Sequence, residues 1–459
     1  MTDVPIEPGA EVRMELGEAV LTFISDFIDQ RESSPASFGP IDPALVEELM
    51  DPPGEAGVEL PVLLDRLQQA TNTGFDSASG RSMSFVPSGG LYTAALGTFL
   101  GSAINRYTGG SHAAPGAVAI EQSVVDWMTS LFGLPASGGG LLLSGGSIAN
   151  LTAVVTARSQ LGDAFHDGVV YTSERAHHSI DKATRIAGIA PNRMRAVPTD
   201  ADLRLDPKAL KQAIRADRGR GLRPLMIVAT AGTTDTGAVD PLAVCAEIAE
   251  AEGTWFHIDA AYGGFFQLTD RGRTRLTGID RADSITVDAH KSLLLPFGIG
   301  GLLVRDPATL IGAHEGHGAY LRDVTDGELP HFLAMGPELT RPNRGLPVWL
   351  ALHLHGVAQF RATLDRMLDL ADDAADQLEG LPGVALAGRP ELSIVAFRAL
   401  AGDAATLHVL DVLNRSGEVH VSSTTIGGHV YVRLAFLSQR TTEEMAARAI
   451  ELIREAVTS

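Results

Sequence analysis

The segment Ser284-Ile285-Thr286-Val287-Asp288-Ala289-His290-Lys291 decides the fold class that this sequence predicts. It is an apolar run that ends abruptly in polar residues, as a buried strand does where it leaves a sheet. A second run of this kind, Trp255-Phe256-His257-Ile258-Asp259, precedes it. We therefore expect a lysine and an aspartate, each at the end of a buried strand.

Short apolar runs and amphipathic stretches alternate from about residue 75 to residue 310. The strand-like runs are 141–143, 169–171, 225–228, 255–258, 285–287 and 301–304, and helix-like stretches such as 147–159 and 241–251 separate them. The alternation predicts an α/β fold, with a mostly parallel sheet of about seven strands and helices on both faces. Because ligands bind at the carboxyl ends of such strands, we expect Gly145, Thr234, Asp259 and Lys291 to meet in one site.

The chain of 459 residues is too long for one simple core, and three parts are expected. Residues 1–70 have helical patterns joined by Pro-rich connections and no evident core, so they should lie on a neighbouring domain or wrap a partner subunit. Residues 71–345 form the large domain. Residues 346–459 form a smaller α+β domain, with one long helix from Leu346 to about Leu378.

Composition narrows the class of partner. The net charge of −20 repels phosphate backbones, so we expect no nucleic-acid partner. No apolar run approaches the roughly 20 residues that span a bilayer, and the N-terminus lacks a secretory signal. The single cysteine, Cys245, excludes an internal disulfide framework. A cytoplasmic location without membrane contact is expected.

Two motifs indicate a phosphorylated, flat ligand. Ser144-Gly145-Gly146-Ser147 joins a strand to a helix, where glycines and free N–H groups suit a phosphate; the alternative is a plain tight turn with Ser147 as N-cap. His177 follows the strand at 169–171, and its imidazole can stack on a heteroaromatic ring, unless it is a surface residue.

Asp259 and Lys291 are more specific. A carboxylate and an ammonium are costly to bury unless each has a partner. A pyridinium N–H suits Asp259, an imine removes the charge problem of Lys291, and small Ala261 leaves room for a flat ring. The residues thus predict pyridoxal phosphate as cofactor. The alternative is a buried salt bridge between Asp259 and Lys291.

No metal site is expected. His314-Glu315-Gly316-His317 has its histidines three apart rather than four, and its glycine favours a mobile loop over a zinc-binding helix.

In this order the motifs resemble a fold-type I pyridoxal-phosphate enzyme of the group II amino-acid decarboxylase family, to which aromatic-L-amino-acid decarboxylase belongs. The similarity spans roughly residues 84–444 and extends to the C-terminal Arg433-Leu434-Ala435-Phe436. It implies decarboxylation of an L-amino acid to the amine and CO₂, in a homodimer. The alternatives are an oxidative aldehyde synthase or another pyridoxal-dependent lyase, and, much less favoured, a non-catalytic binding protein.

The resemblance assigns roles residue by residue. Lys291 would form the Schiff base, Asp259 would pair with the pyridine nitrogen, and Ala261 would lie against the ring. His177 would stack on the opposite face and orient the substrate carboxylate. The cofactor-binding set is completed by Gly146, Ser147, Thr234 and His290. Tyr320, in a glycine-rich loop, would protonate the carbanion; a phenylalanine there would favour the aldehyde.

The sequence also departs from the family pattern. Asp288 stands where an asparagine is common, and because an acid would repel the phosphate, we expect Asp288 to point elsewhere. The resemblance places Phe85, Ser88, Tyr107 and His112 at or near the substrate pocket. Phe85 keeps an aromatic residue of the family pattern, whereas Ser88 is smaller than usual there and His112 is a polar residue nearby. We therefore expect a side-chain specificity unlike that for dopa.

Overall fold

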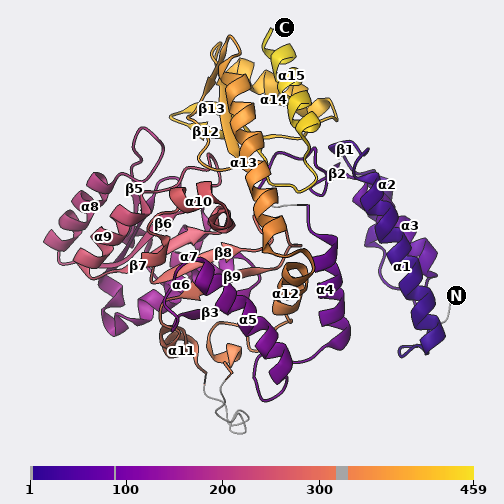
Figure 1. Cartoon of the computed structure of the whole chain (residues 1–459), viewed down its shortest axis with the longest axis horizontal. Coiled ribbons are helices and arrows are strands. Elements are labelled where there is room, and N and C mark those ends of the chain that lie inside the picture. The colour runs from indigo at the N-terminus through magenta and orange to yellow at the C-terminus, as the bar shows by residue number, and fades with distance from the viewer. Residues whose placement is uncertain (1–3, 87–88, 317–328, 459) are drawn as a thin grey trace.

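The structure is a computed structural model, and it describes residues 4–86, 89–316 and 329–458. Its centre is a sheet that has seven strands within this described part of the chain (Figure 1). In spatial order they are β3 (Gly139–Leu143), β9 (Gly300–Val304), β8 (Ser284–Asp288), β7 (Trp255–Ala260), β6 (Arg223–Thr230), β4 (Gly168–Ser173) and β5 (Met194–Val197). Only β9 runs antiparallel to its neighbours, so the expected mostly parallel sheet is confirmed.

Apolar side chains on alternate positions pack on the two faces of this sheet. One face carries α6 (Gly146–Ser159), α7 (Ser179–Ile186) and α11 (Ala308–His314), which pack on residues such as Val170 and Met226. The other face carries α5 (Pro115–Leu131), α8 (Pro207–Gly219) and α9 (Leu242–Glu252), which pack on residues such as Ile227 and Ile258. Both faces are therefore removed from water, as a parallel sheet requires.

A smaller α+β unit follows at the C-terminus (Figure 1, yellow). Its antiparallel sheet is ordered β10-β11-β13-β12. The elements are β10 (Val384–Leu386), β11 (Ile394–Ala399), α14 (Asp403–Arg415), β12 (Ser422–Ile426), β13 (His429–Ala435) and α15 (Glu443–Thr458). Met83, from the segment before the main sheet, packs in the same core as Val395 and Phe397.

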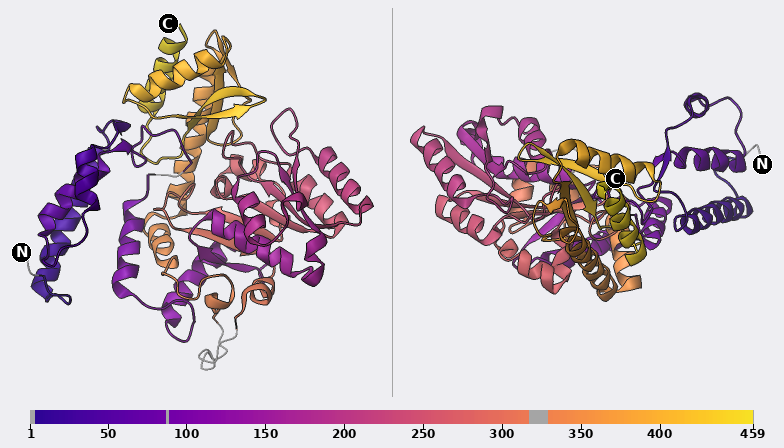
Figure 2. Two further views of the ribbon diagram at one scale, coloured as in Figure 1. Left: turned by 180° about the vertical axis from the view of Figure 1, so that it is seen from behind. Right: turned by 90° about the horizontal axis from the view of Figure 1, so that it is seen from above.

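The single long helix expected from Leu346 to Leu378 is wrong. The structure has two helices, α12 (Gly345–His355) and α13 (Val357–Glu379), because Gly356 between them has φ +70°. An L-residue rarely adopts this angle, so the glycine marks a break that the apolar periodicity alone conceals. The second helix, α13, runs from the large sheet to the C-terminal unit (Figures 1 and 2).

The N-terminal helices lie to one side of the molecule (Figure 2). They are α1 (Ala10–Gln30), α2 (Pro43–Met50) and α3 (Leu60–Thr71), and none of them contains a buried residue. The short strands β1 (Ser37–Gly39) and β2 (Gly74–Phe75) and a buried ion pair of 2.6 Å between Arg31 and Asp76 fasten this segment at its base. Then α4 (Tyr92–Ile104) leads into the large unit.

No helix among the described residues is both long enough and apolar enough to cross a membrane. We propose that the folded chain divides into three parts, with boundaries near residues 70 and 345. Met83, which belongs to the large part in this division, packs in the core of the C-terminal part.

Candidate active site

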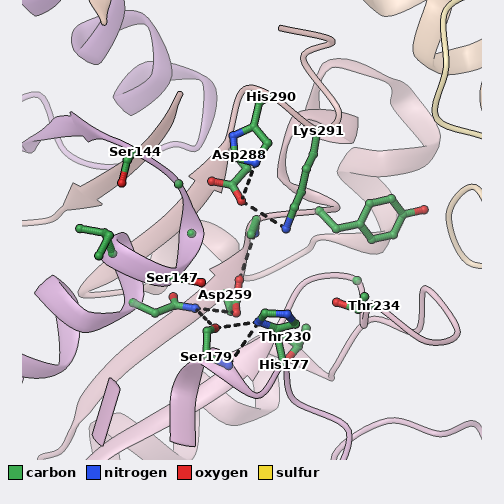
Figure 3. A pocket seen from close by; sticks show the side chains of 17 residues that line it. Ser144, Ser147, His177, Ser179, Thr230, Thr234, Asp259, Asp288, His290 and Lys291 are labelled. Atoms are coloured by element: carbon green, nitrogen blue, oxygen red, sulfur yellow. Dashed lines mark hydrogen bonds and ion pairs between the residues drawn. The ribbon is translucent and has the colours of Figure 1, made fainter. Parts of the chain in front are cut away.

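A cavity of about 320 Å³ opens where the predicted strand ends meet the N-terminus of α6 (Figure 3). Its volume is in the range of small-molecule sites. Its lining includes Gly146, Ser147, His177, Thr234, Asp259, Ala261, His290 and Lys291. The structure therefore brings together all eight residues that the sequence assigns to cofactor binding, and their individual roles stay predictions.

The glycine turn before α6 forms a cradle for an anion. Gly145 has φ +154° and ψ +173°, a conformation open to glycine almost alone. A Cβ on Gly146 would lie 2.9 Å from Asp288 Oδ2 and 3.1 Å from the Cβ of Ala261, so a side chain would fill the cradle. No side chain caps the helix, which leaves its first N–H groups facing the cavity.

Lys291 enters the cavity from the turn after β8 (Figure 3). Its Nζ lies 3.2 Å from Asp288 Oδ2, and no ion pair joins it to Asp259 in the described structure. The alternative of an Asp259–Lys291 salt bridge is therefore wrong for this structure. The lysine side chain is 18% exposed, so its amine can be reached from the cavity.

The expectation that Asp288 points away from the site is also wrong. Strand alternation places Asp288 on the same face of β8 as Ser284 and Thr286, and this face lies against α6. The carboxylate is 2% exposed, and its Oδ1 has no hydrogen-bond partner among the described residues. The cavity thus contains a carboxylate with an unsatisfied oxygen beside the anion cradle.

Asp259 ends β7 and is 5% exposed. Its Oδ2 accepts a hydrogen bond of 2.9 Å from Asn150 Nδ2, and its Oδ1 accepts one of 3.1 Å from the backbone N–H of Ala261. Two neutral donors hold this carboxylate, and no ion pair joins it to a cation among the described residues, so its position suits a ligand group that carries a positive charge.

His177 lies across the cavity from Lys291 (Figure 3). Its Nδ1 is 2.8 Å from Ser179 Oγ. Burial lowers the pKa of His177 below its ordinary value of 6.5, and the nearby Asp259 carboxylate offsets only part of this effect. The ring is therefore neutral at neutral pH, as a group that stacks on an aromatic cofactor can be.

Two further predicted residues are fixed by backbone contacts. His290 Nδ1 donates to the carbonyl of Ile299 at 2.9 Å, which turns its Nε2 toward Asp288 at 3.7 Å. Thr234 lines the cavity, and its carbonyl accepts a hydrogen bond from Arg433 of β13. The C-terminal unit thereby contacts the edge of the site.

Three of the four predicted substrate-pocket residues, Phe85, Tyr107 and His112, are not among the residues that line this cavity. Phe85 is 51% exposed and its ring lies 5.3 Å from that of Phe75. Tyr107 donates to the carbonyl of Leu339, and His112 is exposed beside His331. These three residues flank α4, away from the strand ends, and their part in substrate binding stays a prediction. Ser88 and Tyr320 lie outside the described residues.

Sequence reasoning missed Asn150, Ser179 and His257. Asn150 lies four residues after Gly146, one helical turn along the same face of α6, and it reaches Asp259. His257 shares a face of β7 with Asp259, two residues away. Polar residues at these spacings in otherwise apolar elements were the available signal. The expected mobile loop at His314 is wrong there, because His314 ends α11 and lies 3.1 Å from Thr156 Oγ1.

The donor set fits pyridoxal phosphate. An amine, a carboxylate held by neutral donors, a neutral imidazole and an open helix N-terminus meet at the carboxyl edge of a mostly parallel sheet. This combination defines a pyridoxal-phosphate-dependent enzyme of fold type I.

Comparison with known proteins narrows the class. Residues 60–400 match the family model described as the pyridoxal-dependent decarboxylase conserved domain, and the chain belongs to this family. It is 32% identical to an aromatic-L-amino-acid decarboxylase of Bacillus atrophaeus over 96% of this chain and 94% of the relative. It is 36% identical to an L-2,4-diaminobutyrate decarboxylase of Rhizobium meliloti over 77% and 73%.

A solved structure agrees. The crystal structure of Oryza sativa TDC with PLP and tryptamine superposes with a TM-score of 0.92, at 29% identity over 100% of this chain and 99% of that one. The protein is a carboxy-lyase that uses pyridoxal phosphate to decarboxylate an amino acid.

Proposed function

We propose that Lys291 holds the cofactor through its amine and that Asp259 pairs with the pyridine nitrogen. The observation that carries this proposal is that both side chains enter one cavity from the ends of adjacent strands, β7 and β8. Gly146 and Ser147 offer N–H groups to the phosphate. When bound, the cofactor supplies an acceptor for the electrons that the departing CO₂ leaves behind.

The remaining residues orient the substrate and move a proton. The Asp259 carboxylate would face the ring nitrogen, and because this arrangement exists before the reaction begins, it would favour electron flow into the ring. His177 would offer an N–H to the substrate carboxylate. Tyr320 gives its hydroxyl proton to the substrate Cα, a role that rests on the family resemblance alone. The expected products are the amine and CO₂.

Replacing Lys291 by Ala tests this proposal. The variant should lose the absorbance of the bound cofactor and all CO₂ release. Lys182→Ala is the matched control, because Lys182 is exposed on α7. Unchanged absorbance and turnover in Lys291→Ala would overturn the assignment. Product analysis separates amine release from the aldehyde and peroxide of the alternative activity.

We propose that the substrate is an L-amino acid whose side chain differs in shape from dopa. The relatives support more than one kind of side chain, since the two reported above are named for aromatic amino acids and for L-2,4-diaminobutyrate. CO₂ release from a panel of aromatic, acidic and diamino acids identifies the preferred class. A preference for dopa over all others would contradict the proposal.

We propose that the chain acts as a cytoplasmic homodimer. Helices α1–α3 bury none of their residues, yet they carry apolar side chains such as Met14, Leu63 and Leu67, which are 62%, 44% and 47% exposed. A second subunit would cover them. Light scattering should give twice the mass of one chain, and a stable active monomer would contradict the dimer. Fractionation of the producing cell tests the location.

A further inference from the structure

A buried polar network connects Asp259 and His177 in the candidate active site. Asn150, on α6, donates one amide hydrogen to Asp259 Oδ2 and the other to Ser179 Oγ, each at 2.9 Å. Ser179 Oγ lies 2.8 Å from His177 Nδ1. The Asn150 side chain therefore contacts the Asp259 carboxylate directly and the His177 imidazole through the Ser179 hydroxyl, and these three partners lie close together in Figure 3.

The network continues from Asn150 to residues of strands β7 and β8. His257 Nε2 lies 3.0 Å from Asn150 Oδ1, and His257 Nδ1 lies 2.8 Å from Ser284 Oγ. Trp255 Nε1 donates to the same hydroxyl at 2.8 Å. The paired register of His257 with Ser284 on β7 and β8 holds these groups together.

The acceptor character of Asp259 fixes the direction of every bond. A carboxylate can only accept, so the amide nitrogen of Asn150 must face it and the amide oxygen must face His257. His257 then carries its proton on Nε2, and burial keeps the ring neutral by lowering its pKa to about 4. Its Nδ1 accepts from Ser284, whose oxygen in turn accepts from Trp255.

The same argument from donors and acceptors assigns the tautomer of His177. Ser179 Oγ already accepts from Asn150, so its hydroxyl hydrogen is free for His177 Nδ1. The backbone N–H of Ser179 points at the same nitrogen from 3.3 Å. With Nδ1 occupied as an acceptor, a neutral His177 carries its proton on Nε2.

We propose that Asn150 is a positioning residue that orients the Asp259 carboxylate and, through Ser179, holds His177 as a neutral ring with its Nε2–H directed away from the network. This inference deepens the proposed function and rests on it. The site then contains a donor for a substrate carboxylate that does not depend on protonating an imidazole. A single amide sets both the acceptor at the ring nitrogen and the donor at the substrate.

Asn150→Asp is the decisive variant, because it keeps the shape and replaces an N–H donor with an acceptor 2.9 Å from Asp259. Two facing carboxylates in a buried site share one proton, so the pKa of the pair rises. A raised carboxyl pKa stabilises the fold at low pH and loses that contribution as the pH increases. In cofactor-free protein, the deficit in melting temperature against wild type should therefore widen between about pH 5 and pH 8.

Ser179→Ala tests the connection from Asn150 through Ser179 to His177 without a change of charge. Loss of the hydroxyl should lower kcat with less effect on KM and move the acid limb of the pH profile, since His177 loses its fixed tautomer. Thr172→Val on β4 is the matched control, because the buried Thr172 hydroxyl has no hydrogen-bond partner among the described residues. Ser179→Thr restores the hydroxyl and should recover the wild-type profile.

Cofactor titration of the cofactor-free proteins completes the test. Asn150→Asp should raise the dissociation constant of pyridoxal phosphate about tenfold or more, as expected for a lost hydrogen bond to a charged group. If Asn150→Asp shows a pH-independent deficit and Ser179→Ala behaves like Thr172→Val, the inference is overturned. If wild-type protein itself binds no cofactor, the proposed function fails instead.

Discussion

Replacing Asp288 by Asn should tighten the binding of pyridoxal phosphate. In the described structure, the Asp288 carboxylate lies against the glycine cradle and 3.2 Å from Lys291 Nζ. Its negative charge would repel a phosphate bound at the cradle, and its ion pair with the Lys291 amine would have to break when that amine bonds to the cofactor. Both effects oppose cofactor binding, and asparagine removes both while it keeps the shape.

The ion-pair geometry bounds the size of the effect. Two unit charges 3.2 Å apart attract by about 5 kcal/mol at an effective dielectric constant of about 20. Desolvation of the buried carboxylate and the 18% exposure of the lysine side chain reduce this figure. A net gain of about 1–3 kcal/mol corresponds to a dissociation constant roughly 5- to 150-fold lower.

The assay is a fluorescence titration of cofactor-free protein with pyridoxal phosphate at fixed ionic strength. Asp373→Asn, an exposed change on α13 with the same change in net charge, is the control. Melting curves give a second readout: Asp288→Asn should melt below wild type without cofactor, and saturating cofactor should close or reverse that gap. Weaker binding by the variant would refute the reasoning and show that the carboxylate supports the bound state.

Three further predictions follow from buried contacts. Glu121→Leu removes the carboxylate partner of the Arg341 guanidinium, which is 2.6 Å away and 1% exposed, and leaves it only the carbonyl of Leu142 as a hydrogen-bond partner among the described residues. This should lower the free energy of unfolding in denaturant by about 3–5 kcal/mol. The double variant with Arg341→Met should recover most of that loss, and no recovery would contradict the ion-pair explanation. A lysine at position 433 cannot donate to the carbonyls of Ser84, Thr234 and Asp235 at the same time, as Arg433 does. Arg433→Lys should therefore raise the dissociation constant of the cofactor a few-fold with little change in melting temperature. An unchanged dissociation constant would exclude a role for these hydrogen bonds in cofactor binding. Burial lowers the pKa of His257 to about 4 from 6.5, so between these pH values the unfolded chain binds a proton that the folded chain does not. Stability that is present above pH 6.5 is therefore lost as the pH falls. His257→Gln should reduce the loss of unfolding free energy between pH 7 and pH 5 by about 2 kcal/mol, and an unchanged dependence on pH would contradict the neutral ring.

Site residues could be predicted from the sequence where a local pattern fixes their position in the fold. Asp259 and Lys291 could be placed because each terminates an apolar run, and parallel strands bring their carboxyl ends to one edge. The direction of Asp288 was mispredicted because repulsion from a phosphate was weighed, whereas the two-residue period of β8 decides which face a side chain occupies.

Other residues depended on contacts between distant segments. Phe85 and its neighbours lie in a segment whose path is held by Arg440, which donates to the carbonyls of Ala78 and Gly89, and by Arg433, which donates to Ser84. These contacts span more than 340 positions in the chain. No local sequence pattern encodes these contacts, so the path of this segment could not be predicted from the sequence, and the substrate pocket stays a prediction.

The two carboxylates in the cavity differ in a way that sets the orientation of a bound cofactor. Asp288 already has a cation, Lys291, at 3.2 Å, and it lies beside the anion cradle at the start of α6. Asp259 has two neutral donors, and no ion pair joins it to a cation in the described part of the chain. If the proposed roles hold, a ligand with an anionic end and a cationic ring nitrogen would bind with its anion at Gly146 and its ring nitrogen at Asp259. Under the proposed function, this difference between the two carboxylates would favour one orientation of the bound cofactor before any contact with substrate is made.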